Sequence, residues 1–502
     1  MQDSVSSNPS EPIRLSESAT QTFALCLTLV AILAAGIAVA ISNLTLPIAR
    51  NAFCYAKAAL AILNHHFNLI AVMRDATLTS GKPIIFSSLA APAVWMFGAN
   101  TGTVIAAVVG TIFFLWMTIL ALQRLNSRAH LAQKLLPLEL LLVFLNPLVI
   151  YQFWSGYPDS LFAGLVLAAF VISDSIASEA KSASTVKALL LGLTIFVAIH
   201  TKLYGSILLA ACPAYILAVR RKLSPLLMIV ISVLIVDLLT AQLGINPLLQ
   251  LSEGAGYGGF GNSDILGSVV MFGFFAVMML HFSLAFLWSK SAWRAWTPAP
   301  ALFIGIYLLV LLAFSGTFYN MRYFIPALPF IAVSLTAGSA SFSRRAKGPL
   351  LTAYCIVSIV LISIFNIQPV ERMADPGLSR LTANMQWALW LDNLRLQMQL
   401  RLKRQIDAIN SHVPRGSRFY WSSDYYSTAT HGMGKEVGVS SSVDIRYVLH
   451  TRDIPPSATS VYTTEFGVDG ANDQLHDVPG WATATPLGDG LFRLDPRSSK
   501  QN

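Results

Sequence analysis

The chain has 502 residues, of which 55% are hydrophobic and only 12% are charged, and its mean hydropathy is +0.60. An ordinary soluble domain carries about 25% charged residues, so this composition argues against a soluble enzyme and excludes disordered, collagenous and disulfide-scaffold proteins. The net charge of +9 lies entirely within residues 1–369, because residues 370–502 contain 14 basic and 14 acidic residues. Since the polar part of the chain is neutral, nucleic acid is not an expected partner.

Long apolar runs divide most of the chain into predicted membrane-spanning segments. A transmembrane helix needs about 20 mostly apolar residues. Runs of suitable length predict eleven spans, near residues 22–42, 101–122, 134–152, 160–177, 188–200, 203–219, 225–243, 265–288, 299–315, 324–340 and 349–367. We therefore expect an all-α polytopic membrane domain at 22–369, preceded by a tail at 1–21 and followed by a C-terminal domain at 370–502.

Basic residues predict the orientation of these spans, because cationic loops are retained in the cytoplasm. With the N-terminus inside, the predicted cytoplasmic loops carry 13 of the 20 basic residues in residues 1–369. They are Arg124, Arg128, Lys134, Lys181, Lys187, Arg220, Arg221, Lys222, Lys290, Arg294, Arg344, Arg345 and Lys347. An odd number of spans then places the C-terminal domain outside, in the periplasm if the membrane is a bacterial inner membrane.

Three segments are expected on the extracytoplasmic side. The first is a long loop at 43–100, within which the apolar segment 84–98 is too short for a span and is predicted to be re-entrant or interfacial. The second is a glycine-rich loop at 244–264, interpreted as a mobile loop over a site. The third is the C-terminal domain from about residue 370 onward.

The C-terminal domain is predicted to be a small α+β domain. It opens with an amphipathic helix at about 379–411, in which apolar residues recur at a spacing of three to four. The residues of this stripe are Trp387, Leu391, Leu394 and Met398, and the predicted strands are Arg418–Trp421, Val443–Leu449, Ser460–Thr464 and Gly490–Leu494.

Ionisable residues at the predicted outer ends of the spans indicate a site, because charge is expensive in lipid. Asp159 lies in the turn before the fourth span. Lys202 lies in the tight turn between spans five and six, and Arg322 lies at the start of span ten. Two such cations suit a phosphate, which Arg binds through paired hydrogen bonds and Lys as a point charge. Simpler roles stay open: the cations can extend to the interface, and the acid can cap its helix.

No clear set of metal ligands is present. The four cysteines are scattered without a Cys-x-x-Cys spacing, and the adjacent His65 and His66 would point in different directions on a helix. Acidic residues are too few for a convincing all-carboxylate site. We therefore predict no metal-ligating residues, and leave open whether a divalent cation acts as a cofactor.

Several short motifs resemble one family of membrane enzymes. They are RNAFCYAKAA at 50–59, SGKPIIFSSL at 80–89, WMFG at 95–98, GYPDS at 156–160 and NMRYFIPALP at 320–329. Their order resembles integral membrane glycosyltransferases of the C-type (GT-C) superfamily, which include protein mannosyltransferases and bacterial aminoarabinose transferases. The resemblance covers most of 20–370, and the eleven-span topology with an external C-terminal domain is similar too.

The resemblance implies a fold and an activity. Such enzymes take a sugar from a polyprenyl-phosphate donor in the outer leaflet of the membrane and transfer it to a hydroxyl of a protein, lipid or glycan. An acid in their first external loop serves as the catalytic base or orients the acceptor, but Asn51 occupies that position here. Asparagine cannot take up the proton, so three alternatives follow: Asp159 or Asp75 is the base, the acceptor needs little activation, or activity has been lost.

The resemblance also implies which residues hold the donor. Lys82, from the Lys-Pro motif, is expected to bind the donor phosphate, with Lys202 and Arg322 stabilising it as it leaves. The aromatic and polar residues of the matching motifs and of the turn at 200–205 are expected to line the substrate: Tyr55, His200, Tyr204 and Tyr323.

Two other classes of function compete with this interpretation. A transporter or glycolipid flippase would place ionisable residues near the midplane of the membrane and would often show paired halves, whereas this chain places them near one surface and shows no repeat. A catalytically inactive glycan-assembly protein would explain Asn51. The partners expected for the enzyme are the lipid-linked donor, membrane lipid, and a protein or glycan acceptor.

Overall fold

The computed structural model describes most of the chain. The described residues are 11–44, 50–74, 83–132, 135–178, 185–220, 279–314, 321–366, 392–422, 438–448, 450–464 and 477–497, with isolated positions between these segments. Several predicted features lie outside them: Asp75, Lys82, nearly all of the span at 225–243, the glycine-rich loop at 244–264, most of the span at 265–288 and the first part of the helix at 379–411.

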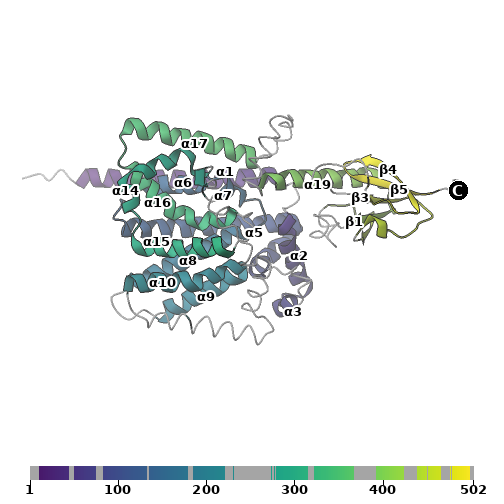
Figure 1. Cartoon of the computed structure of the whole chain (residues 1–502), viewed down its shortest axis with the longest axis horizontal. Coiled ribbons are helices and arrows are strands. Elements are labelled where there is room, and N and C mark those ends of the chain that lie inside the picture. The colour runs from purple at the N-terminus through teal and green to yellow at the C-terminus, as the bar shows by residue number, and fades with distance from the viewer. Residues whose placement is uncertain are drawn as a thin grey trace, which may run out of the picture.

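The described helices form a bundle of roughly parallel rods with a small sheet beyond one end (Figure 1). The rods are α1 (Glu11–Asn43), α5 (Ile85–Arg128), α8 (Asp159–Ser178), α9 (Thr185–Thr201), α10 (Leu208–Arg220), α15 (Pro298–Phe314), α16 (Leu328–Ser339) and α17 (Arg344–Asn366). Within the described residues, four helices are long and apolar enough to cross a bilayer, namely α1, α5, α8 and α17. The chain is a multi-pass membrane protein, and the predicted fold class is confirmed.

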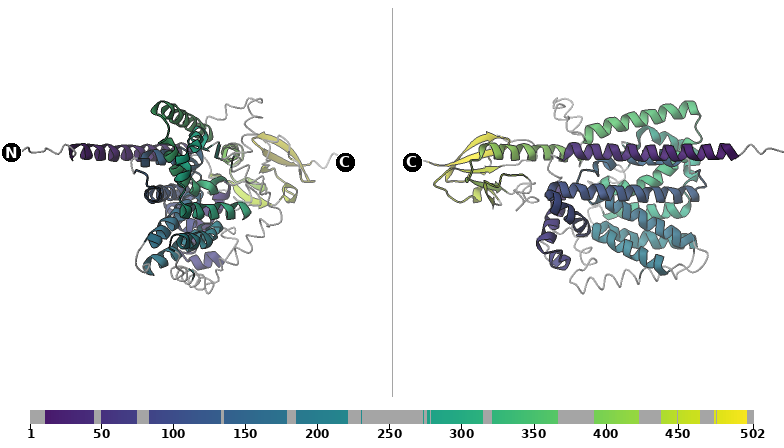
Figure 2. Two further views of the ribbon diagram at one scale, coloured as in Figure 1. Left: turned by 60° about the vertical axis from the view of Figure 1, so that its left-hand side comes forward. Right: turned by 180° about the vertical axis from the view of Figure 1, so that it is seen from behind.

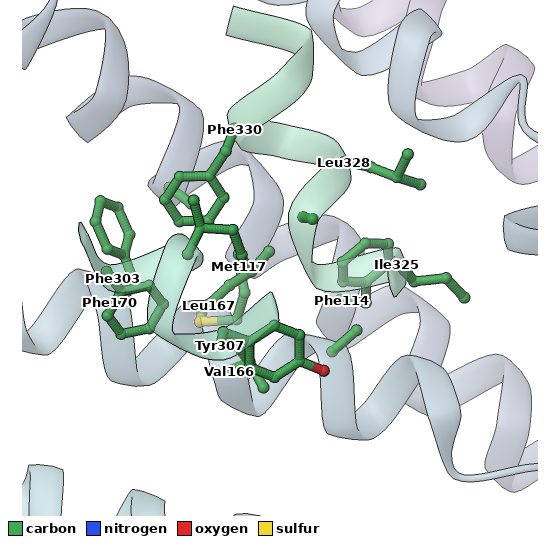
Figure 3. Packing of buried hydrophobic residues seen from close by; sticks show 14 of the residues in the cluster. Phe114, Met117, Val166, Leu167, Phe170, Phe303, Tyr307, Ile325, Leu328 and Phe330 are labelled. Atoms are coloured by element: carbon green, nitrogen blue, oxygen red, sulfur yellow. The ribbon is translucent and has the colours of Figure 1, made fainter. Parts of the chain in front are cut away.

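Aromatic rings from neighbouring helices form the centre of the bundle (Figure 3). The ring centroid of Phe170 on α8 lies 5.0 Å from that of Phe330 on α16 and 5.4 Å from that of Phe303 on α15. Side chains on the outside of the bundle are apolar as well, as a lipid-facing surface requires. They include Phe23, Leu27, Val30, Ile112, Trp116, Leu189, Leu193, Ile356 and Ile359.

Helix α5 contains a sharp bend that separates the predicted interfacial segment from the following span. Gly98 has φ 80°, a conformation that glycine adopts readily. The chain folds back there so closely that a Cβ on Gly102 would lie 2.3 Å from the backbone nitrogen of Val94. Residues 85–97 therefore form a separate apolar helix beside the start of the span.

Four predicted spans differ from continuous α-helices within the described residues, and two of them, at 203–219 and 324–340, begin in 3₁₀ helices. The span at 134–152 is divided into α6 (Leu136–Phe144) and α7 (Pro147–Tyr151). The side chain of Asn146 caps the start of α7, because it accepts a hydrogen bond from the Leu148 amide at 2.9 Å. Pro147, the first residue of α7, has no amide hydrogen and so cannot continue the hydrogen bonding of α6. The end of the span at 265–288 is a 3₁₀ helix, η3 (His281–Trp288).

The first loop forms short helices that lie across the end of the bundle nearest the sheet (Figure 2). These are α2 (Arg50–Asn64) and α3 (Leu69–Arg74). Helix α2 buries Phe53, Tyr55 and Ile62 in a cluster shared with the first part of α5. The loop thus caps the bundle end where α8 begins.

The C-terminal domain is a five-stranded sheet preceded by α19 (Asp392–His412). The strands are β1 (Arg418–Ser422), β2 (Asp444–Val448), β3 (Val461–Thr464), β4 (Ala482–Gly488) and β5 (Leu491–Pro496). Their order is β2-β1-β3-β5-β4, with β1 parallel to β2 and β3, and β5 antiparallel to β3 and β4. The four predicted strands are present; β4 is an edge strand that contains Pro486, which obscured it in the sequence.

Candidate functional site

The turn at 154–159 sets the start of α8 and the position of its first carboxylate. Gly156 has φ 71°, which reverses the chain. The carbonyl of Pro158 accepts a hydrogen bond from the Phe162 amide at 2.8 Å and so closes the first helical turn. Asp159 is the first residue of α8, where the positive end of the helix dipole favours a negative charge.

The second component of the site comes from the turn between α9 and α10. The Lys202 amide donates to the carbonyl of Ala198 at 2.9 Å, and the Lys202 carbonyl accepts from the Gly205 amide at 2.8 Å. The following 3₁₀ helix, η2 (Leu203–Ile207), lies directly on the end of α9. A Cβ on Gly205 would come within 2.4 Å of the Ala198 backbone carbon. Only a glycine permits this contact, which fixes the backbone that carries the lysine.

The third component comes from η4 (Met321–Ala327), the 3₁₀ helix that precedes α16. It carries Arg322 and Tyr323. The hydroxyl of Tyr307, on α15, donates to the Tyr323 carbonyl at 2.8 Å. This hydrogen bond ties η4 to a fully buried position in the neighbouring helix.

These three segments bring one acid and two cations together. The Lys202 ammonium pairs with Oδ1 of Asp159, and Nη1 of Arg322 lies 3.1 Å from Oδ2 of the same carboxylate. The exposed fractions of the three side chains are 8%, 3% and 1% for Lys202, Arg322 and Asp159. Burying charges is costly even when they are paired, and the three described side chains carry one positive charge in excess.

Tyrosine rings surround the charged cluster. The Lys202 ammonium lies 4.2 Å from the ring centroid of Tyr323, and the Arg322 guanidinium carbon lies 4.1 Å from that of Tyr157. Both are cation–π contacts. The rings of Tyr204 and Tyr323 lie 4.6 Å apart.

Helix α2 adds a further tyrosine to the same region. Burial raises the pKa of the Tyr55 phenol well above its ordinary value, and the negative charge of Asp159 raises it further. Its ring packs edge-on against Phe86 at the start of α5, with centroids 5.5 Å apart. Tyr55 is therefore held as a neutral phenol next to the cluster.

The structure brings together most of the described residues that the sequence singled out: Asp159, Lys202, Arg322, Tyr55, Tyr204 and Tyr323. His200 is buried, but its ring packs on Phe196 at 4.3 Å rather than on the cluster. The backbone of Asn51 lies in the first turn of α2. Asp75 and Lys82 lie outside the described residues.

Two members of the site were missed in the sequence. Tyr157 lies within the GYPDS motif but had not been given a role. Tyr307 lies in an almost wholly apolar helix, so nothing in its neighbourhood distinguishes it from a core residue. Among the described residues, no group of three or more His, Cys, Asp and Glu gathers as metal ligands.

Comparison with solved structures identifies the fold. The bundle with its end domain has the same fold as a solved structure of ArnT. A structure of ArnT, an aminoarabinose transferase, from Cupriavidus metallidurans bound to undecaprenyl phosphate matches with a TM-score of 0.57 and 13% identity, over 94% of this chain and 98% of that one. Its apo structure matches with a TM-score of 0.49 and 13% identity, over 87% and 92%. No protein-family model matches, and no curated protein matches in sequence.

Proposed function

We propose that the protein is a membrane glycosyltransferase that takes a sugar from a polyprenyl-phosphate donor and transfers it to an acceptor hydroxyl. The observation that carries the proposal is the convergence of Lys202 and Arg322, from segments far apart in the sequence, on one buried point at the end of the bundle. The fold adds support, since ArnT, whose structure contains undecaprenyl phosphate, has the same fold.

The chemistry of glycosyl transfer matches these side chains. The sugar passes through an oxocarbenium-like state while negative charge develops on the departing phosphate. Lys202 and Arg322 stabilise that charge. Asp159 contacts both cations, and it is the described carboxylate that we assign to accept the proton of the acceptor hydroxyl. Tyr55, Tyr204 and the rings around them line the sugar.

The first loop completes this proposal with residues whose side chains the structure does not describe. Lys82 joins the phosphate site, as the resemblance of its Lys-Pro motif implies. Asn51 occupies the position of the family's acid and cannot serve as the base. Asp159 therefore takes that role, with Asp75 as the alternative.

We place the site on the extracytoplasmic side of a bacterial inner membrane. The argument is the distribution of basic residues, because Arg128, Lys187 and Arg220 all bind to the last turns of α8, at the opposite end from Asp159. The C-terminal domain lies beyond the same bundle end as the first loop (Figure 1). This domain is then periplasmic and well placed to present the acceptor.

Transfer can be tested with purified protein in detergent. The protein is given undecaprenyl phosphate carrying a labelled sugar, from a panel that includes aminoarabinose, together with membrane extract as the source of acceptor. Mass spectrometry follows the release of undecaprenyl phosphate. Without compartments, this product cannot arise from transport. Release that depends on Arg322 supports the proposal, whereas no release with any sugar contradicts it.

Asn51 favours one second candidate, a protein that binds the lipid-linked sugar without transferring it. The same experiment separates the two, because an inactive protein binds the donor intact and releases no undecaprenyl phosphate from it. The acceptor is best found in cells. Mass spectrometry of surface glycans, pilins and lipid A in a deletion strain reveals which molecule loses a sugar.

A further inference from the structure

The carboxylate of Asp159 is bound as a phosphate would be. Its two oxygens are shared between two cations, with Lys202 on one and Arg322 on the other. A phosphodiester also offers two charged oxygens on one central atom. The carboxylate thus takes the ion pairs that a donor phosphate would make with the same two cations.

The two cations have supports that do not depend on Asp159. Lys202 faces the ring of Tyr323, and the backbone on either side of it is fixed by the contact between Gly205 and α9. Arg322 faces the ring of Tyr157. If the carboxylate moves away, both cations therefore keep a contact that holds them in position.

The charge of the described side chains favours the entry of a second anion into the site. One carboxylate and two cations leave a single positive charge in a site where all three side chains are buried. A donor phosphodiester brings one negative charge and offsets this excess, while the carboxylate gives up its place on the cations but stays nearby. Among the described residues of the site, Tyr204 and Tyr323 are partly exposed, so we expect the donor to enter past these rings.

From this geometry we infer that Asp159 occupies the position of the donor phosphate in the structure described here, and that the phosphate displaces it. This inference rests on the proposed function. The displaced carboxylate becomes free to accept the proton of the acceptor hydroxyl. The acceptor oxygen then bonds to the anomeric carbon, whose bond to the phosphate oxygen breaks with its electron pair on the phosphate. Asp159 can therefore act as the base only when the donor is bound.

The test is the affinity of purified protein for undecaprenyl phosphate in detergent. A carboxylate that competes with the phosphate predicts that Asp159→Asn binds undecaprenyl phosphate about tenfold more tightly than wild type, which equals about 1.4 kcal/mol, while sugar transfer is lost. A carboxylate that only positions the cations predicts weaker binding in the same variant, and that result overturns the inference. Asp174→Asn, at the other end of α8, is the matched control and leaves the affinity unchanged.

A structure of the wild-type protein with undecaprenyl phosphate keeps the inference testable if Asp159→Asn fails to fold. The expected result is a phosphate between Lys202 and Arg322, with Asp159 beyond hydrogen-bond distance of at least one of them. A phosphate bound while both ion pairs persist overturns the inference but leaves the proposed function intact. If wild-type protein binds no undecaprenyl phosphate, the proposed function fails as well.

Discussion

The two ends of α8 carry the same arrangement of charges in different surroundings. Asp159 begins the helix, and Asp174 lies one turn before its end at Ser178. Each carboxylate is buried and pairs with two cations. At Asp159 the cations are 8% and 3% exposed. At Asp174 they are Arg124 and Arg128, which are 48% and 31% exposed.

The difference shows which cluster has a structural explanation. The cations at Asp174 reach water, so their desolvation costs little, and they lie at the helix end where a positive charge is favoured. The carboxylate also accepts a hydrogen bond from Tyr215 at 2.6 Å, and Arg128 binds Ser178 at 2.7 Å. These contacts tie α8 to α5 and α10.

The helix dipole accounts for Asp159 at the start of α8, but the described contacts give no comparable explanation for the two buried cations. These cations are cut off from water, and replacing buried ion pairs with apolar residues is often neutral or stabilising. A membrane protein would therefore gain little stability from keeping two cations and one acid at that point. We attribute the cluster to function, and the matched end of α8 provides control residues for each test.

The largest expected effect comes from removing one cation at each end of α8. Arg322→Gln should lower sugar transfer by about 100- to 1,000-fold, because one charge-stabilising group for the departing phosphate is lost. Arg128→Gln should leave transfer close to wild type, since its guanidinium serves only the structural cluster. Both are measured as the rate of undecaprenyl phosphate release. Equal losses of transfer rate in the two variants would contradict the assignment of function to the Asp159 end of α8 alone.

A smaller effect is expected from a change that moves Lys202 without altering it. Gly205→Ala places a methyl group within 2.4 Å of the Ala198 backbone, so η2 must shift. We expect a loss of about 1–3 kcal/mol of stability and reduced transfer. Gly305→Ala on α15 is the control, because no atom lies within 4 Å of its new Cβ. Thermal unfolding and transfer rates are compared, and a fully active, stable Gly205→Ala protein would show that this turn does not position the lysine.

The smallest effect concerns two buried tyrosines that each donate to a backbone carbonyl. Tyr307 binds the carbonyl of Tyr323, whose ring faces Lys202, and Tyr354 binds that of Leu142 at 3.1 Å. Replacing either with Phe should cost about 1 kcal/mol of stability. Only Tyr307→Phe should also slow transfer, by up to about tenfold. If Tyr354→Phe slows transfer as much, the effect follows from stability alone.

The sequence predicted the helices better than the interruptions within them. Hydropathy located the spans because lipid imposes length and apolarity on every transmembrane helix. It could not show that α6 ends before Asn146, since that break depends on a side chain capping the next helix. The edge strand β4 was missed for a related reason, because Pro486 interrupts a pattern that otherwise fits a strand.

At the site, the sequence identified the charged residues but not how they pair. Asp159, Lys202 and Arg322 stood out because charge is rare at the ends of apolar segments. Their convergence on one carboxylate depends on the packing of α8 against α9 and η4, which no local pattern encodes. Tyr307 contributes through a hydroxyl in an otherwise apolar helix, so only the three-dimensional contact reveals it.

The affinity of undecaprenyl phosphate for variants at the two ends of α8 tests the central claim most directly. Binding is measured at equilibrium in detergent for wild type, Arg322→Gln and Arg128→Gln. A hydrogen bond to a charged group contributes about 1.5–3 kcal/mol, so Arg322→Gln should weaken binding by about tenfold or more, and Arg128→Gln should leave it unchanged. Unaltered binding in Arg322→Gln, or weaker binding only in Arg128→Gln, would contradict the assignment of the donor phosphate to the buried end of α8.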